Sequence, residues 1–440
     1  MTFFRTTFVA LVALVALAAL PGCDAFGLDD EPSPNGAAIE DILDNPTDAA
    51  ITNLAVGIEA SARTSIGAYL VDTGVLGREY WRVSPSDPRF TQDLLGKAES
   101  VLDNNTFYIT QPWGARYGAI RNANTMLLAL DLNPTLSDAQ KAGGRGFAKT
   151  WIAYQYLLNL NLTFENGIRF IGPGEETAGP LVGYDESLDR IAALLDEAAG
   201  DLDGGAFFFP TSISPPLGEP GFVSYPQFNR ALAARVDAYR EDWQGVLDAL
   251  DGSFIDAAGD LTTGAYHVFS NNAGDVTNPL FFPRDGGGDG LLAHPSFIAD
   301  TLAGDLRDEQ KTVERTDART FDFLTSNFDV AIPATPTSPL PIIRNAELLL
   351  LRAEANAQLG NGGVEDDINV IRNAAGLEDY DGDTDTDSLI NEILYQRRYE
   401  LYAEGHRWLD LRRYGRLGVL PIDREGDDVF DRFPVPEQDA

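Results

Sequence analysis

Cysteine is almost absent from this chain of 440 residues, in which Cys23 is the only one. A single cysteine cannot form a disulfide within the chain, so the fold does not depend on a disulfide framework. Zinc sites built from several cysteine ligands are excluded for the same reason. A lone cysteine so close to the N-terminus needs an explanation of its own.

Positive charge is also scarce: 32 basic residues face 68 acidic residues, and the formal net charge is −36 at pH 7. A chain this acidic is not expected to bind nucleic acid, or to adhere to an anionic membrane through its charge. Only four of the basic residues are lysines: Lys97, Lys141, Lys149 and Lys311. Strong acidity with arginine far above lysine predicts adaptation to high salt, which screens repulsion between like charges. An ordinary acidic surface protein is the alternative.

The short motifs of common active sites are missing as well. We find no nucleophile elbow, HExxH helix, Walker loop or Rossmann fingerprint. The histidines, His267, His294 and His406, lie far apart in the sequence. A pair of glycosidase carboxylates cannot be chosen among 68 acidic residues. The sequence therefore assigns no catalytic residue, and we predict no cofactor.

The N-terminus resembles a lipoprotein signal. Residues 1–22 combine Arg5 with an apolar run from Phe8 to Leu20 that is too short to span a membrane comfortably. Leu20-Pro21-Gly22-Cys23 resembles a lipobox, which predicts acyl chains on Cys23 and a stable anchor. A plain signal peptide with an incidental cysteine is the alternative. Residues 23–37, acidic and rich in glycine and proline, are predicted to form a flexible tether.

Apolar residues at helical spacing predict a mostly helical protein. Helices that recur in pairs favour repeats of the tetratricopeptide type, in a single domain over 38–440. We divide it into a helical part over about 38–260, a loop-rich part over about 261–340 and a C-terminal part over about 341–440. The predicted helices cover 38–70, 113–130, 144–160, 187–202, 228–239, 242–250, 345–359, 365–375 and 388 to about 405.

Three long segments break the helical pattern: 71–109, 204–225 and 265–341. Glycine, proline and aromatic residues are concentrated in them, and we expect irregular loops and a short hairpin on one face of the helical scaffold. Long irregular segments inside a compact domain are usually functional or disordered. We therefore expect the ligand site in these segments, grafted on one face of a helical scaffold.

The predicted helix over 388–405 has charges on its apolar stripe. Ile390, Ile393 and Leu394 are followed on the same face by Arg397, Glu400 and Glu404. Charges at buried positions are costly unless they are paired. The spacing predicts ion pairs of Arg397 with Glu400 and of Glu404 with Arg407.

Three runs near the C-terminus together resemble the signature of the RagB/SusD family: residues 368–377, INVIRNAAGL; 397–401, RRYEL; and 404–413, EGHRWLDLRR. Residues 117–124 and 304–307 also resemble parts of its pattern. Gln396 departs from that pattern, where glutamate is common. We interpret these residues as those that pack a helical core, and not as ligand contacts.

The resemblance implies a SusD-like α-superhelix and a lipoprotein anchored in the outer membrane, facing the exterior. Members of the family bind nutrients, mainly oligosaccharides and less often peptides, and do not turn them over. The implied partner is a SusC-like TonB-dependent transporter, which the protein would cap as a lid. A peptide-binding member of the family and a surface lipoprotein hydrolase are the alternatives.

Aromatic residues in the irregular segments are the candidate ligand contacts, because the apolar face of a sugar packs on an aromatic ring while its hydroxyls need polar partners. The resemblance also places ligand contacts near Tyr80 and Trp81. The alternative is that these rings only pin their loops to the scaffold. Trp113, Trp151 and Trp243, on helical stripes, and the amide of Asn124 are predicted to be core. The candidates are Asp72, Tyr80, Trp81, Arg82, Phe207, Phe208, Asn278, Phe281 and Phe282.

One acidic run has the oxygen spacing of an EF-hand-like calcium loop. Its candidate ligands are Asp381, Asp383, Asp385, Asp387 and Glu392. Thr386 stands where such a loop needs glycine. In so acidic a chain this spacing also arises by chance, and Asp387 alternatively caps the following helix.

Overall fold

The computed structural model describes residues 39–215 and 217–439. The predicted signal, Cys23 and the whole of the predicted tether lie outside these residues. The chain divides into two units, up to Asn45 and from Pro46 onward. The first contributes the short helix α2 (Ile39–Asp44). No helix within the described ranges is long and apolar enough to cross a membrane.

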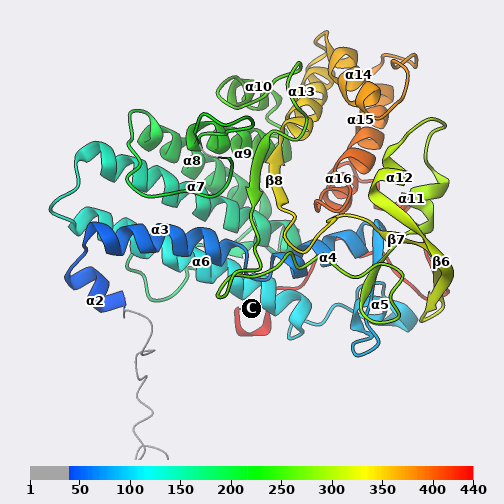
Figure 1. The fold of residues 1–440 in the computed structure, drawn as a ribbon, viewed down its shortest axis with the longest axis horizontal. Helices are drawn as coiled ribbons and strands as arrows, with labels where there is room; N and C mark the ends of the chain where they lie inside the picture. The colour runs from blue at the N-terminus through cyan, green and yellow to red at the C-terminus, as the bar shows by residue number, and fades with distance from the viewer. Residues whose placement is uncertain (1–38, 216, 440) are drawn as a thin grey trace, which may run out of the picture. The chain divides into compact units, whose positions relative to one another are not determined.

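The second unit is built on helices that pack in sequence order, each against the next (Figure 1). Contacts run from α3 to α6 and on through α7, α8, α9 and α10 to α13, α14 and α15, which confirms the tetratricopeptide-like prediction. These helices are α3 (Asp48–Ala62), α6 (Phe107–Leu132), α7 (Asp138–Thr163), α8 (Tyr184–Leu202), α9 (Tyr225–Tyr239), α10 (Trp243–Asp251), α13 (Asn345–Leu359), α14 (Val364–Ala374) and α15 (Thr386–Glu400).

Local sequence explains where the long helices begin and how closely they pack. A capping box of Ser137 and Gln140 starts α7, and another of Ser224 and Gln227 starts α9. Gly146 lets α7 approach α8, because a Cβ at this position would overlap the side chain of Leu202. The resulting core buries Trp113 and Trp151 as predicted, whereas Trp243 is half-buried.

Shorter helices connect this scaffold to the rest of the unit. Helix α4 lies wholly inside the protein, because all but one of its residues are buried. The short helices are α4 (Ile66–Leu76), α5 (Arg89–Gln92), α11 (Pro295–Ala299), α12 (Arg307–Lys311) and α16 (Arg407–Arg413), with 3-10 turns at Lys97–Glu99, Phe164–Asn166, Leu417–Val419 and Glu437–Asp439.

Three antiparallel sheets lie among the connections between the helices, and two of them fall largely in the segments predicted to be irregular. The largest has the strand order β1-β5-β7-β6, and its hairpin of β6 and β7 lies far from α8 (Figure 1). Strand β4 pairs with β8, and β2 with β3. The strands are β1 (Tyr80–Val83), β2 (Ile168–Arg169), β3 (Leu181–Val182), β4 (Gly264–His267), β5 (Gly290–Ala293), β6 (Thr312–Phe321), β7 (Leu324–Val330) and β8 (Leu340–Arg344).

The prediction of an irregular segment over 71–109 is wrong in large part. Helix α4 extends to Leu76, β1 follows, and α6 begins at Phe107. Strand β1 is too short to show an alternating pattern, and all four of its residues are buried. Aromatic and β-branched residues at the start of α6 and Pro112 inside it are weak helix formers, so the helix is held there by packing of buried Tyr108 and Ile109.

Candidate ligand-binding site

Two of the segments without helical pattern meet at an open pocket of about 670 Å³, which we name the loop pocket. Its size is within the range of pockets that hold small organic ligands. Pockets of about 600 and 460 Å³ elsewhere in the described chain are lined by several charged residues. The loop pocket is lined by Ile213, Ser214, Pro215, Pro220, Gly221, Asp260, Thr262, Thr263, Gly264, Tyr266, Val268 and Pro339.

Helix α3 holds both walls of the loop pocket in place. The carboxylate of Glu59 accepts hydrogen bonds from the backbone N (2.9 Å) and the Oγ (2.6 Å) of Ser212, beside one wall. Burial raises the pKa of Glu59, although these bonds and one from Tyr225 oppose the shift. One turn further, Arg63 donates to the carbonyl of Val268 in the other wall (2.6 Å) and to Asp275 (2.7 Å).

The pairing of β4 with β8 positions the aromatic ring of the pocket. Gly264 lies opposite Arg344, and a Cβ on this glycine would overlap the carbonyl oxygen of Ile343. The register shifts between Ala265 and Tyr266, as at a β-bulge, which re-aims a side chain. The backbone N of Tyr266 donates to the carbonyl of Ile213 (2.7 Å), and so joins the two walls.

The loop pocket combines apolar surface with a few polar groups. Its three prolines, Val268 and the half-buried Tyr266 supply flat apolar faces. Asp260 is exposed, and its Oδ1 accepts bonds from the N (2.8 Å) and Oγ1 (2.7 Å) of Thr262. This pattern of a ring, proline faces and a polar rim can hold a ligand that has both apolar faces and hydroxyl groups.

A second cavity of about 330 Å³ adjoins the loop pocket, with which it shares Thr262 and Pro339, and we name it the inner pocket. Its apolar lining comes from Leu280 and from residues 332–334 and 338–341, with Tyr402 and Ala403. Its charged lining consists of Lys311, Arg344, Glu400 and Glu404.

These charged groups bind one another. Arg344 donates to Glu400 (2.8 Å) and to Glu404 (2.7 Å). Lys311 donates to the carbonyls of Tyr399 (2.6 Å) and Glu400. Burial alone would raise the pKa of Glu400, but Arg344, Lys311 and Arg307 lower it to about 2. The predicted pairs of Glu400 with Arg397 and of Glu404 with Arg407 are therefore wrong, because β8 brings Arg344 to both carboxylates.

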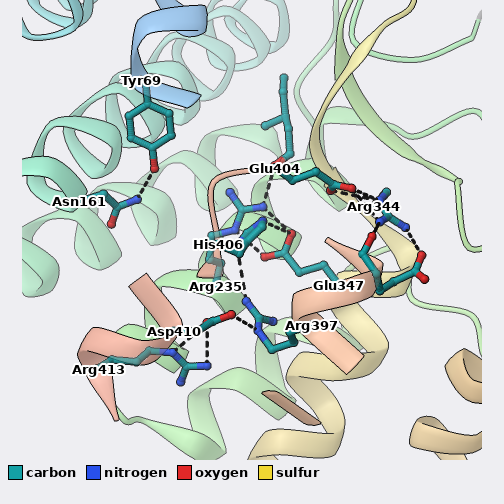
Figure 2. Close-up of polar contacts among 12 residues, drawn as sticks. Tyr69, Asn161, Arg235, Arg344, Glu347, Arg397, Glu404, His406, Asp410 and Arg413 are labelled. Carbon is teal, nitrogen blue, oxygen red and sulfur yellow. Dashed lines mark hydrogen bonds and ion pairs between the residues drawn. The ribbon is translucent and has the colours of Figure 1, made fainter. Parts of the chain in front are cut away.

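Figure 2 shows that the charged residues of the C-terminal signature form a buried network. Arg397 donates to Asp410 on α16 (2.7 Å) and lies 3.4 Å from His406. Glu347 on α13 receives two bonds from Arg235 on α9 (2.7 and 2.6 Å). Arg235 and His406 of this network line a cavity of only about 20 Å³, room for roughly one water molecule. The network ties helices together. Glu400 and Glu404 also line the inner pocket, and Arg412 and Arg413 line the pocket of about 600 Å³, so the absence of ligand contacts among the signature residues stays a prediction.

The structure buries five of the predicted ligand contacts: Asp72, Tyr80, Trp81, Arg82 and Asn278. Tyr80 and Trp81 lie in β1, where the Tyr80 hydroxyl donates to Leu70 (2.7 Å) and Trp81 Nε1 donates to Asp423 (3.0 Å). Arg82 donates to Asp289 (2.9 Å) beneath the ring of Phe282. Asp72 is fully buried in α4. None of these side chains presents a surface to a sugar, so their prediction as an accessible platform is corrected.

Burial raises the pKa of Asp72 well above its usual range, and neither of its carboxylate oxygens has a hydrogen-bond partner in the described chain. Asn278 is buried as well, and its amide pins a loop by donating to Ser338 (2.7 Å). Both residues are therefore structural and not ligand contacts. The predicted core amide of Asn124 is confirmed by its bond to the carbonyl of Ile171 (2.9 Å).

The predicted phenylalanines remain accessible in part. Phe207 is 37% exposed and stacks on Tyr225, with ring centroids 5.2 Å apart. Phe208, Phe281 and Phe282 are half-buried. None of the four lines the loop pocket or the inner pocket. Their role as ligand contacts stays a prediction.

The predicted calcium ligands do not converge. Asp385 caps α15 by accepting bonds from the N (3.2 Å) and Oγ (2.6 Å) of Ser388, so this residue and not Asp387 is the cap. Glu392 instead binds Arg372 (2.5 Å). Within residues 39–215 and 217–439, no group of three acidic, histidine or cysteine side chains is placed to hold a metal ion. The remaining candidates, Asp381 and Asp383, are exposed in the preceding turn.

Solved structures identify the fold of the protein. The chain is similar to a SusD-like carbohydrate-binding protein of Bacteroides vulgatus, with a TM-score of 0.64 and 17% identity over 83% of each chain. It is also similar to the surface glycan-binding protein A of Bacteroides thetaiotaomicron, solved in complex with laminarihexaose. That match has a TM-score of 0.66 and 15% identity over 84% of this chain and 90% of the other. The protein thus has the SusD-like fold.

Sequence comparisons agree with this class. Residues 325–437 match the model of the SusD family. A SusD-like protein of Formosa agariphila is 38% identical over 90 residues, a match that spans only 18% of this chain and 18% of that protein. The likeness to the RagB/SusD family in sequence is thus confined to this C-terminal segment, and the fold of the chain is SusD-like.

The sequence did not single out the residues of the loop pocket. Pro215 and Tyr266 lie in segments without helical spacing of apolar residues. This absence was the only indication in the sequence that the two residues belong to loops near a site. Nothing in the sequence shows that these segments meet, because the contacts that join them, such as Tyr266 with Ile213, link residues far apart in the chain.

Proposed function

We propose that this protein binds oligosaccharides in the loop pocket and does not hydrolyse them. The observation that carries the proposal is the composition of this pocket: Tyr266 and three prolines beside the hydroxyl and carboxylate groups of Ser214, Thr262 and Asp260. Sugars need such a combination, because their C–H faces pack on flat apolar surfaces and their hydroxyls require polar partners. The solved glycan-binding proteins of the same fold support this choice of ligand.

We further propose that the protein is a lipoprotein of the outer membrane that faces the exterior and delivers its ligand to a SusC-like TonB-dependent transporter. The lipobox-like sequence that ends at Cys23 supports the anchor. The match of residues 325–437 to the SusD family supports the partner and the location. The acidic residues 23–37 would then give the binding unit reach above the membrane.

Calorimetry with a panel of neutral oligosaccharides and peptides tests the site. Tyr266→Ala removes the ring and should weaken binding of the best ligand by about tenfold, whereas Tyr266→Phe keeps the ring and should bind almost normally. Phe207→Ala and Phe281→Ala alter rings outside the pocket. Loss of affinity in these variants, with Tyr266→Ala unaffected, would move the site to the phenylalanines predicted from the sequence. A panel in which only peptides bind would favour peptide capture.

Prolonged incubation tests for catalysis. The protein and its best oligosaccharide are kept together for a day, and the products are separated by chromatography. We expect the oligosaccharide to be recovered unchanged. Shorter products, or new reducing ends, would favour a surface lipoprotein hydrolase instead.

A further inference from the structure

The loop pocket has an unusual charge. Among its lining residues, Asp260 is the single side chain that is ionised at neutral pH. Hydrogen bonds from the backbone and side chain of Thr262 lower the pKa of Asp260, and burial raises the pKa of Tyr266 to about 12. Both hydrogen bonds that the Asp260 carboxylate accepts in the described chain reach Oδ1, and the residue is exposed, so its negative charge is open to a ligand at this rim.

The basic groups near the loop pocket are already bound. Arg63, behind the wall at Val268, is held by the carbonyl of that residue and by Asp275. In the adjoining inner pocket, Arg344 binds two carboxylates and Lys311 binds two carbonyls. The guanidinium of Arg344 is therefore neutralised by carboxylates, and within the described chain no basic side chain lines the loop pocket.

The wider field has the same sign. Glu219, exposed on the loop between two lining prolines, adds a second carboxylate near the rim. The chain as a whole carries a net charge of −36. A negative potential around a site repels anions and concentrates cations, and salt weakens both effects.

We infer that the loop pocket selects glycans by charge: it takes neutral oligosaccharides, prefers those that bear free amino groups, and excludes those that bear uronate or sulfate groups. This inference rests on the proposed glycan-binding function and adds a substrate class to it. One like charge placed about 4 Å from Asp260 near the surface is sufficient to weaken binding by roughly tenfold or more.

Matched probes separate charge from sugar shape. Hexaoses of β-1,3-glucan, β-1,4-glucan and α-1,4-glucan are each used in three forms: neutral, oxidised to a uronate at C6, and aminated at C6. Binding to the full chain is measured by calorimetry in about 0.15 M salt. The uronate form should bind at least about tenfold more weakly than its neutral parent, and the amino form several-fold more tightly.

Two variants identify the responsible group. Asp260→Asn removes the charge and keeps an oxygen that can accept both bonds from Thr262, so it should shrink the preference several-fold. Asp256→Asn removes an exposed carboxylate that does not line the pocket, and it should leave the preference unchanged. A parallel series on the unaltered chain raises the salt to about 1 M, which shortens the screening length from about 8 Å to about 3 Å and should bring the three forms closer in affinity.

The outcomes separate the two proposals. Uronate forms that bind as tightly as neutral ones, or a preference that survives both Asp260→Asn and high salt, would overturn selection by charge and leave glycan binding intact. Failure of all nine probes to bind would overturn glycan binding by this site, and the charge preference with it. The unaltered chain in the salt series keeps the test decisive even if Asp260→Asn does not fold.

Discussion

Glu79 is a residue whose burial costs the protein stability at neutral pH. It lies between α4 and β1, and one of its carboxylate oxygens accepts a bond from the backbone N of Ala403 (3.1 Å). The other oxygen is buried without a partner in the described part of the chain. Burial raises the pKa of Glu79 to about 8, so the carboxyl holds a proton at a pH where it would be ionised in the unfolded chain.

Replacing Glu79 by glutamine should therefore stabilise the protein, and more so as the pH rises. The folded state binds the extra proton between the ordinary pKa of 4.5 and about 8, so the stability of the wild type falls with pH across this window. The gain in Glu79→Gln should grow by up to about 1.4 kcal/mol per pH unit there and level off above it. Urea unfolding between pH 5 and pH 8 measures the gain. A gain that is constant with pH would show that Glu79 is already ionised in the folded state.

Phe323 is held in a strained and exposed position. It follows Asp322 at the turn between β6 and β7, and both residues have positive φ angles, 50° at Asp322 and 65° at Phe323. Asp322 fixes this turn by accepting bonds from Arg424 (2.7 Å), Thr91 (3.1 Å) and Lys97. Phe323 itself is 84% exposed. A two-residue turn of this kind strongly favours glycine at its second position.

Phe323→Gly should accordingly raise the free energy of unfolding by about 1 kcal/mol, because it relieves the left-handed strain and removes little buried surface. Phe323→Ala keeps a Cβ and serves as the control, in which the strain and hence the stability stay near those of the wild type. Both are compared by chemical denaturation. A glycine variant no more stable than the alanine variant would contradict the strain.

At the scale of elements, the ion pair of Arg235 with Glu347 joins α9 to α13. Both side chains are buried and meet through two short hydrogen bonds. Burial alone would raise the pKa of Glu347, but Arg235, His406 and Arg397 lower it to about 2. The pair therefore contributes stability that is present above a pH of about 4.5 and is lost as the pH falls toward 2.

Glu347→Ala should destabilise the protein by roughly 3–5 kcal/mol, because it leaves the guanidinium of Arg235 buried without its partner. The exposed pair of Arg190 with Glu186 on α8 provides a control: Glu186→Ala should cost at most about 0.5 kcal/mol. Thermal unfolding of both variants measures the difference, and sugar binding by the folded fraction should hardly change. Equal effects in the two variants would mean that the buried network is not what holds these helices together.

Helices were the elements that the sequence predicted well. The stripes over 345–359 and 365–375 gave α13 and α14 almost to the residue, because their apolar spacing is local information. The partners of the charged stripe were not predictable. Arg344 lies in a strand and binds Glu400, which is more than fifty residues away in the sequence. The i,i+3 rule could not predict this pair, because it considers only neighbours in one helix. Strand β1 was missed because four buried residues carry no alternation.

The candidate site was predicted only in outline. The sequence marked 204–225 and 265–341 as segments apart from the helices, and the loop pocket lies where parts of them meet. The sequence favoured aromatic residues as ligand contacts because of their type. Residue type does not decide accessibility: Trp81 is buried in a sheet, whereas Tyr266 lines a pocket. Burial depends on contacts distant in sequence, such as the pairing of β1 with β5.

At the scale of the whole molecule, the net charge of −36 predicts a dependence on salt. The melting temperature should fall as sodium chloride is diluted from about 1 M to about 0.1 M, because the screening length grows from about 3 Å to about 10 Å and the surface carboxylates repel one another. Potassium chloride at equal ionic strength should act alike. A melting temperature that stays level or rises on dilution would refute adaptation to high salt.

The proposed anchor predicts the distribution of the protein between cell fractions. Cys23→Ala should release it from the outer membrane, because the single acylation site is lost. Pro21→Ala alters the same lipobox-like run, keeps the cysteine and should remain in the membrane fraction. Fractionation is done in cells that lack the transporter, so that binding to this partner does not retain the chain. A Cys23→Ala protein that still sediments with the membrane argues against lipidation.

The way α3 carries the walls of the loop pocket makes the binding face modular. Glu59 and Arg63 hold the two walls, while the pair of Arg235 with Glu347 that joins the helices lies elsewhere. Residues 213–221 and 260–263 could therefore be exchanged for those of a relative while Glu59 and Arg63 are retained. We expect such an exchange to change the ligand specificity and to leave the helical scaffold unchanged.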